Sequence, residues 1–141
     1  RKVTCKLIGG QLRVQGKELT TERTQKAVRQ WYRDRAVDVF QRRLSMMVET
    51  LPWTKTVPEW RMLDMQTQWG SCSHQGAVLL NPHLIKANMR AIDYVLLHEL
   101  CHLVEHNHSP RFYALLDRYM PEWRSVKERL DGQAEQLLGG M

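Results

Sequence analysis

The stretch that decides the fold is His98-Glu99-Leu100-Cys101-His102, an H-E-x-x-H pattern inside an apolar segment. Apolar side chains recur every three or four positions over residues 91–106, and this period predicts a helix. Four residues turn an α-helix by about 400°, so both imidazoles leave one face about 6 Å apart. Two ring nitrogens placed in this way can reach one metal ion.

A third ligand is expected shortly after this helix. His108 follows Asn107 and precedes Ser109-Pro110, so it lies on a predicted turn where the chain can fold back. His106, in a continued helix, would lie about 12 Å along the axis from His98, too far to share its ion. We therefore expect His108 as the third ligand, with Glu122 as the alternative.

Three imidazoles suit zinc, although copper, nickel and iron also accept them. Three protein ligands leave one position for water, which is typical of a catalytic site. The pKa of a zinc-bound water falls to about 7. Glu99 can take its proton without ligating the metal and later deliver it to the leaving group. The residue that stabilises the oxyanion is left open among Tyr113, Arg111 and His106.

Other histidines and cysteines have simpler interpretations. Without a metal, His98 and His102 would be ordinary helix histidines. His74, His83 and His106 lack ligand spacing and are expected to be exposed or packed. Cys101 lies off the line of the two histidines and is expected in the core, and Cys72 is expected to be structural.

Composition restricts the class of protein. The chain has 141 residues, with 21 Lys and Arg against 15 Asp and Glu, a net charge of +6 and a pI near 9.5. This charge permits nucleic acid, an acidic surface or an anionic substrate as a partner, and selects none of them. Hydrophobic residues make up 43%, which is ordinary for a globular chain, and we expect a single domain over residues 1–141. The sequence carries no signal of the oligomeric state.

The compartment follows from weaker signals. Three cysteines are too few for a disulfide framework and favour a reducing, cytoplasmic compartment. No apolar run approaches the roughly 18 residues of a membrane span, so no membrane partner is expected. The chain begins at Arg1 without a signal-like segment, which suggests a trimmed piece of a slightly longer, non-secreted protein.

The N-terminal third predicts a hairpin and a long helix. Alternating residues over about 3–15 flank Gly9-Gly10, which supplies the turn. Helical periodicity over about 22–50 begins after Thr20 or Thr21 as a cap and stops before Pro52. The other faces of this helix are rich in arginine. They are either a nucleic-acid or phosphate surface or a solvated face with Asp34 and Asp38 as local partners.

Two strands are predicted upstream of the H-E-x-x-H helix, over residues 61–68 and 77–81, with a turn-rich segment between them. Downstream, Ser109 caps a helix that Pro110 opens and Pro121 interrupts, and a last helix covers about 122–138. Together these elements predict an α+β fold.

An ordered series of short sequence blocks extends from Arg61 to Trp123. The blocks, in order, are Trp69-Gly70-Ser71-Cys72-Ser73, Leu80-Asn81, Tyr94-Val95, His98–Leu103, Asn107-His108-Ser109 with Phe112, and Pro121 with Trp123. This series resembles the YgjP-like zinc metallopeptidase family, which is related to the Wlm, SprT-like and minigluzincin proteases. The resemblance implies a zincin-like α+β domain, in which a small twisted sheet packs on the H-E-x-x-H helix beside a long N-terminal helix and C-terminal helices.

The resemblance also implies site roles. The metal ligands would be His98, His102 and His108, and the base would be Glu99. Residues 77–81 would form an edge strand beside the cleft, to which a peptide could add by backbone hydrogen bonds. Family members often carry arginine where this chain has Gln68, and the glycine of metzincins before the third histidine is replaced by a glutamate.

The leading functional hypothesis is a zinc-dependent hydrolase, specifically a metallopeptidase acting on peptides or proteins through a Glu-activated water. One alternative keeps the metal and hydrolyses a nucleoside triphosphate or another anionic substrate. A second alternative is a DNA-associated, SprT-like protein in which proteolysis is secondary, with the arginines of the long helix as the feature to test.

Overall fold

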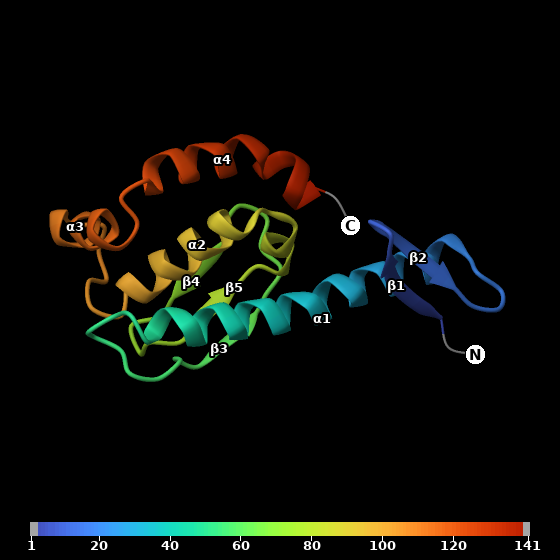
Figure 1. Cartoon of the computed structure of the whole chain (residues 1–141), viewed down its shortest axis with the longest axis horizontal. Coiled ribbons are helices and arrows are strands. Elements are labelled where there is room, and N and C mark those ends of the chain that lie inside the picture. Colours follow the sequence, from blue (N-terminus) through green and yellow to red (C-terminus); the bar gives the residue numbers. More distant parts are fainter. Residues whose placement is uncertain (1–2, 140–141) are drawn as a thin grey trace.

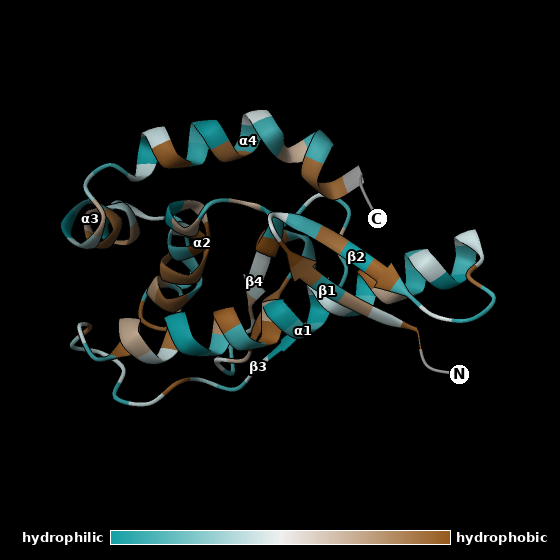
Figure 2. Cartoon of the chain, turned by 45° about the vertical axis from the view of Figure 1, so that its right-hand side comes forward, coloured by the Kyte–Doolittle hydropathy of each residue, from teal (hydrophilic) through white to brown (hydrophobic). Residues whose placement is uncertain are grey.

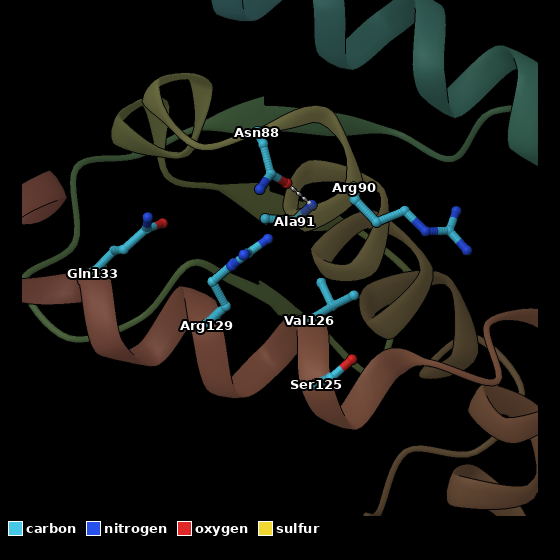
Figure 3. Close-up of a pocket in the computed structure, with 7 residues that line it drawn as sticks. All are labelled: Asn88, Arg90, Ala91, Ser125, Val126, Arg129 and Gln133. Atoms are coloured by element: carbon cyan, nitrogen blue, oxygen red, sulfur yellow. Dashed lines mark hydrogen bonds between the residues drawn. The ribbon is translucent and has the colours of Figure 1, made fainter.

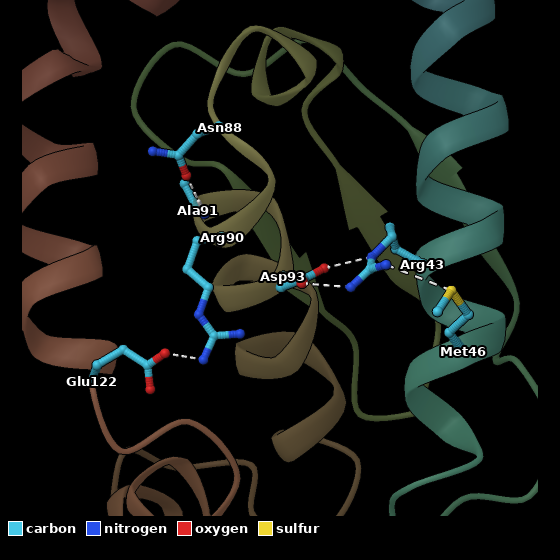
Figure 4. A network of polar contacts seen from close by, with 7 residues as sticks. All are labelled: Arg43, Met46, Asn88, Arg90, Ala91, Asp93 and Glu122. Atoms are coloured by element: carbon cyan, nitrogen blue, oxygen red, sulfur yellow. Dashed lines mark hydrogen bonds and ion pairs between the residues drawn. The ribbon is translucent and has the colours of Figure 1, made fainter.

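One helix, α2 (Met89–Cys101), lies at the centre of the fold, and ten of its thirteen residues are buried. The computed structural model describes residues 3–139, so four terminal residues of the predicted domain 1–141 lie outside the described residues. Helix α1 (Thr21–Val48) flanks α2 on one side and α4 (Trp123–Gly139) on the other (Figure 4). Burial on all sides explains why the sequence of α2 is apolar nearly all round.

A three-stranded sheet packs on α2 in the order β3-β5-β4. Strand β5 (Val78–Leu80) is central, parallel to β3 (Trp60–Met62) and antiparallel to β4 (Gly70–Cys72). The expectation that residues 77–81 form the edge strand is therefore wrong. Val78 and Leu80 point to the same face of the sheet and are 1% and 0% exposed, because that face packs into the hydrophobic core. The edge strand next to α2 is β4.

The predicted strand over residues 61–68 ends at Met62. The Asn81 side chain donates to the carbonyls of Met65 and Gln68 at 2.8 and 2.9 Å, and these bonds hold the segment as a loop. The segment predicted as turn-rich contains strand β4 before it turns at Gly76, whose φ is +88°. After β5, a short 3-10 helix, η1 (Pro82–Lys86), leads into α2; it was not predicted.

The N-terminal elements follow the prediction. Strands β1 (Thr4–Ile8) and β2 (Gln11–Gln15) form an antiparallel hairpin whose turn residues, Gly9 and Gly10, have φ of +56° and +79°. Hydrophilic and hydrophobic residues alternate along β2, and along β1 as far as Leu7 (Figure 2). The Thr20 side chain caps α1 by accepting from the backbone N–H of Arg23. The hairpin lies against the N-terminal half of α1, away from α2 and α3 (Figure 1).

The C-terminal helices begin where the sequence predicts. Helix α3 (Pro110–Tyr119) is capped by the Ser109 hydroxyl, which accepts from the N–H of Phe112. Helix α4 starts two residues after Pro121. None of the helices among residues 3–139 combines the length and apolarity that a bilayer span requires.

Ion pairs fasten the outer helices to α2 (Figure 4). Arg43 of α1 donates to both carboxylate oxygens of Asp93, at 2.9 and 2.7 Å, and Asp93 is only 6% exposed. A two-pronged contact of this kind fixes orientation as well as distance. On the other side, Arg90 of α2 pairs with Glu122, the residue immediately before α4.

Candidate metal centre

Three histidine rings converge at the C-terminal end of α2. Their Nε2 atoms lie 3.3 Å apart for His98 and His102, 3.1 Å for His102 and His108, and 3.2 Å for His108 and His98. Nitrogen ligands about 2.1 Å from a tetrahedral ion would lie about 3.4 Å from one another. The three rings therefore fit around one ion, and among residues 3–139 they are the group of this kind that could hold a metal.

Convergence depends on where α2 ends. The helix stops at Cys101, and His102 is its C-cap, with its N–H bonded to the carbonyls of Glu99 and Leu100. The N–H groups of Val104 and Glu105 then both bond the carbonyl of Cys101 and close a tight turn. The expected helical continuation to residue 106 is therefore wrong. The early end lets the chain return, so that His108 points at the first two rings.

The rings are held by packing and by one backbone contact. Phe112, fully buried, contacts all three rings with centroid separations of 4.9, 4.5 and 4.9 Å. The Nδ1 of His102 lies 3.0 Å from the Glu105 carbonyl oxygen, which only accepts. Nδ1 must therefore donate, which leaves the lone pair on Nε2, the atom that faces the other rings.

Electrostatics keep the first two rings neutral. Burial, together with the neighbouring histidines, lowers the pKa of His98 to about 3. Burial also lowers the pKa of His102. Metal ligation requires neutral imidazole, so these two rings are in the ligating form at neutral pH.

Glu99 follows His98 in α2, is only 4% exposed, and lies on the side of α2 that packs against β4. Burial raises the pKa of its carboxyl to about 8. Its Oε1 has no hydrogen-bond partner within the described part of the chain. A buried carboxyl oxygen without a structural partner is uncommon and is typical of a group kept for chemistry.

The sequence of this chain matches a known protein family. A model of the YgjP-like metallopeptidase domain matches residues 3–133. The chain belongs to the YgjP-like metallopeptidase family. The predicted family and enzyme class are thereby confirmed, and membership of a metallopeptidase family implies a metal cofactor. No curated protein sequence matches the chain.

Two solved structures share the fold. The metallopeptidase zymogen jannalysin of Methanocaldococcus jannaschii is 18% identical, with a TM-score of 0.53 over 70% of this chain and 95% of that chain. The zymogen abylysin of Pyrococcus abyssi is 19% identical, with a TM-score of 0.52 over 67% and 90%. These similarities confirm the predicted α+β, zincin-like fold.

The alternative ligand Glu122, and the other histidines and cysteines considered in the sequence of this YgjP-like chain, have contacts or protonation states of their own. Glu122 is engaged by Arg90, which leaves the cluster to the three histidines. Burial raises the pKa of the Cys72 thiol to about 11 and that of Cys101 to about 12. His106 packs against His74 with the rings tilted and 4.7 Å between centroids. Each of these groups has a partner or protonation state that explains it without a metal.

A groove of about 630 Å³ opens beside the cluster, with His98 and His108 in its wall. Three aromatic rings from α2, α3 and α4 form the adjoining wall. Trp123 stacks on Tyr94 at 6.2 Å and on Tyr113 at 5.5 Å between centroids. Of the three residues considered for the oxyanion, Tyr113 lines this groove, while Arg111 and His106 do not.

Sequence reasoning missed this aromatic wall. Tyr94 stands four residues before His98, a spacing that places both on one face of a helix, so its position could have been predicted. Trp123 comes from another helix, and no local pattern indicates that it stacks on Tyr94.

A separate cavity of about 370 Å³ lies between the start of α2 and α4 (Figure 3). Arg129 of α4 points toward the first turn of α2, where the Asn88 side chain caps the N–H of Ala91 at 2.8 Å. This end of α2 lies about 12 Å along the helix axis from His98. The cavity is therefore not part of the metal centre.

Proposed function

We propose that this protein is a zinc peptidase in which His98, His102 and His108 hold the ion and Glu99 is the general base. The observation that supports it most directly is the mutual approach of the three Nε2 atoms to within 3.3 Å. An all-imidazole set with a compact, four-coordinate spacing favours zinc. When bound, zinc supplies Lewis acidity toward water and toward a carbonyl oxygen.

Glu99 handles the proton in this proposal. Its Oε1 accepts the proton of the attacking water and returns it to the nitrogen of the leaving amine. Burial raises the pKa of this carboxyl to about 8, close to the value near 7 that a bound zinc would give water, so the proton can pass between the two in either direction. Packing against Gly70 keeps the carboxylate on the side of α2 that faces β4.

A peptide is placed by two features. Strand β4 pairs with β5 on one side, and among the described residues its other edge carries no strand. An extended peptide can add there through backbone hydrogen bonds. The groove of Tyr94, Tyr113 and Trp123 then receives a substrate side chain next to the scissile bond, and its volume suits a large apolar or aromatic residue.

Charge favours a peptide over a nucleotide in this groove. Its two cationic residues each face a carboxylate: Arg124 lies 2.9 Å from Asp117, and Lys127 lies 2.7 Å from Asp131. Paired cations leave little positive potential for a triphosphate. A nucleotide panel offered beside unfolded protein substrates separates the two chemistries, and cleavage of phosphoanhydrides alone would remove the peptidase proposal.

The Glu99→Gln variant tests the base. Because glutamine keeps the shape but cannot accept a proton, we expect zinc affinity to stay within a few-fold and turnover to fall by about 10²–10⁴. Zinc affinity is measured by competition with a chelating dye, and turnover with a fluorogenic peptide library. Glu135→Gln, the same change at an exposed position of α4, is the matched control. Retained turnover in Glu99→Gln would contradict the assignment.

A further inference from the structure

Positive charge is concentrated in one part of the molecule. Residues 1–35 contain ten Lys and Arg against three Asp and Glu, whereas residues 36–141 contain eleven against twelve. The first segment therefore carries +7 and the remainder −1. We call the hairpin β1–β2 and the first half of α1, up to Arg35, the N-terminal arm. The buried residues of α1 begin only at Ala36, so the arm stands outside the core that holds the histidines.

The hairpin has one apolar and one basic face. Its inner positions, such as Cys5 and Val14, pair across the strands on the side that packs against α1. On the outer face Lys6 stands directly opposite Arg13. Like charges in a cross-strand pair destabilise a hairpin, and a bound anion would relieve that repulsion. Residues 3–17 contain no acidic side chain that could do so.

Helix α1 adds a second set of cations. Lys26, Arg29 and Arg33 are three or four residues apart and share one face of the helix. Among residues 3–139 none of these three, nor Lys6 or Arg13, forms an ion pair. Cations nearer the core are different, because Arg42 and Arg43 are paired with Asp38 and Asp93.

We propose that the N-terminal arm binds double-stranded DNA through its phosphate backbone. A two-stranded ribbon and an α-helix are the two elements that a B-DNA major groove admits. Polar residues on the outer hairpin face, Thr4, Gln11 and Gln15, are suited to contacts with phosphate and sugar. A membrane-binding face would instead carry a row of large apolar or aromatic side chains, and Ile8 is the single one on this face.

Single-stranded nucleic acid fits less well. Its binding sites rely on exposed aromatic platforms, and the arm's Trp31 and Tyr32 are half-buried and packed edge-on at 5.2 Å. Duplex RNA presents a narrow major groove that excludes the ribbon. The N-terminal arm therefore favours duplex DNA, and its binding should depend little on the base sequence of that DNA.

Fluorescence anisotropy of the full chain with a labelled random-sequence DNA duplex tests the proposal. Affinity is expected to fall steeply with salt, by about 0.9 log units per log of salt for each phosphate bound. Two variants, Lys6→Gln with Arg13→Gln and Lys26→Gln with Arg29→Gln and Arg33→Gln, are each expected to weaken binding about tenfold or more. Each should also flatten this salt slope by about one for every phosphate that the variant no longer neutralises.

The control removes three positive charges elsewhere, as many as the larger of the two variants. Lys55→Gln, Arg118→Gln and Arg129→Gln are all exposed positions outside the arm and should leave the affinity within about twofold. Absence of duplex binding, an equal fall in affinity in the control, or binding to phosphatidylserine vesicles in place of DNA would each overturn the proposal. Thermal melting verifies that the variants fold. Peptide cleavage should be unchanged in all of them, so the result is independent of the peptidase proposal.

Discussion

Gly70 is a residue whose missing side chain makes room for the carboxyl group of Glu99. A Cβ at this position would lie 3.0 Å from Oε2 of Glu99 and 3.1 Å from the backbone oxygen of Leu79. The β5 backbone cannot yield, so an added methyl group must push the glutamate. Glycine here serves close packing between β4 and α2, and its φ lies outside the left-handed region.

We expect Gly70→Ala to reduce kcat by at least about tenfold, because a small displacement of the proposed general base, Glu99, is costly. Zinc affinity should be preserved, since the three histidines are untouched. Gly132→Ala in α4 is the control: a Cβ there meets nothing within 4 Å, and the change should stabilise the helix by up to about 1 kcal/mol. Steady-state kinetics and zinc titration measure both variants; an unchanged kcat in Gly70→Ala would contradict the packing argument.

Tyr113 can act through its ring or through its hydroxyl, and two substitutions distinguish these roles. Its ring stacks on Trp123 and is 37% exposed, so we expect it to serve as a wall of the groove. Tyr113→Ala should then raise KM with a smaller effect on kcat, while Tyr113→Phe stays within about threefold of wild type. A fall in kcat of about 10²–10³ in Tyr113→Phe would instead assign the hydroxyl to the oxyanion.

At the scale of elements, Asn81 ties the loop before β4 to the end of β5. The side chain is fully buried, donates to two carbonyls and accepts from the N–H of His83 at 3.0 Å. Asn81→Ala should cost about 2–4 kcal/mol of unfolding free energy, because it leaves these buried groups without partners. Urea unfolding measures the loss. Asn107→Ala, at an exposed position, should change the unfolding free energy by less than about 0.5 kcal/mol.

Local signals predicted the elements that local chemistry makes. The hairpin turn at Gly9-Gly10, the Thr20 cap and the Ser109-Pro110 start of α3 are all in place. Strand β4 was not predicted, because Gly70-Ser71-Cys72 is short and lacks β-branched residues. The strand forms because it pairs with β5. The loop over residues 63–68 was predicted as a strand, because the hydrogen bonds that hold it come from Asn81, more than ten residues away.

The three converging histidines were predictable from the sequence, and their geometry was less so. Helical spacing predicted that His98 and His102 share one face of a helix. The position of His108 after the helix indicated that the chain folds back toward them. The end of α2 carried no sequence signal, because apolar Leu103 and Val104 continue the helical pattern. Burial of Glu99 under β4 depends on a contact between distant segments, which no local pattern reports.

For the whole molecule, a bound metal should stabilise the folded state by linkage. Zinc at about 100 times its Kd adds about 2.7 kcal/mol, which is several degrees in Tm for a chain of this size. His108→Ala should remove most of this increase, and a chelator should reverse it in the wild type. His74→Ala, an exposed histidine outside the cluster, is the control. An equal zinc-induced shift in His108→Ala would contradict the three-histidine site.

Helix α1 runs without interruption from the arm into the core, over 28 residues or about 42 Å. Its length makes it a rigid spacer between the two ends of the protein. With the charge at one end, the molecule has a large electric dipole along its long axis, and a polyanion would orient it arm first. The histidine cluster would then be held at a fixed distance from the polyanion. It would be within reach of proteins bound to the polyanion and away from the polyanion itself.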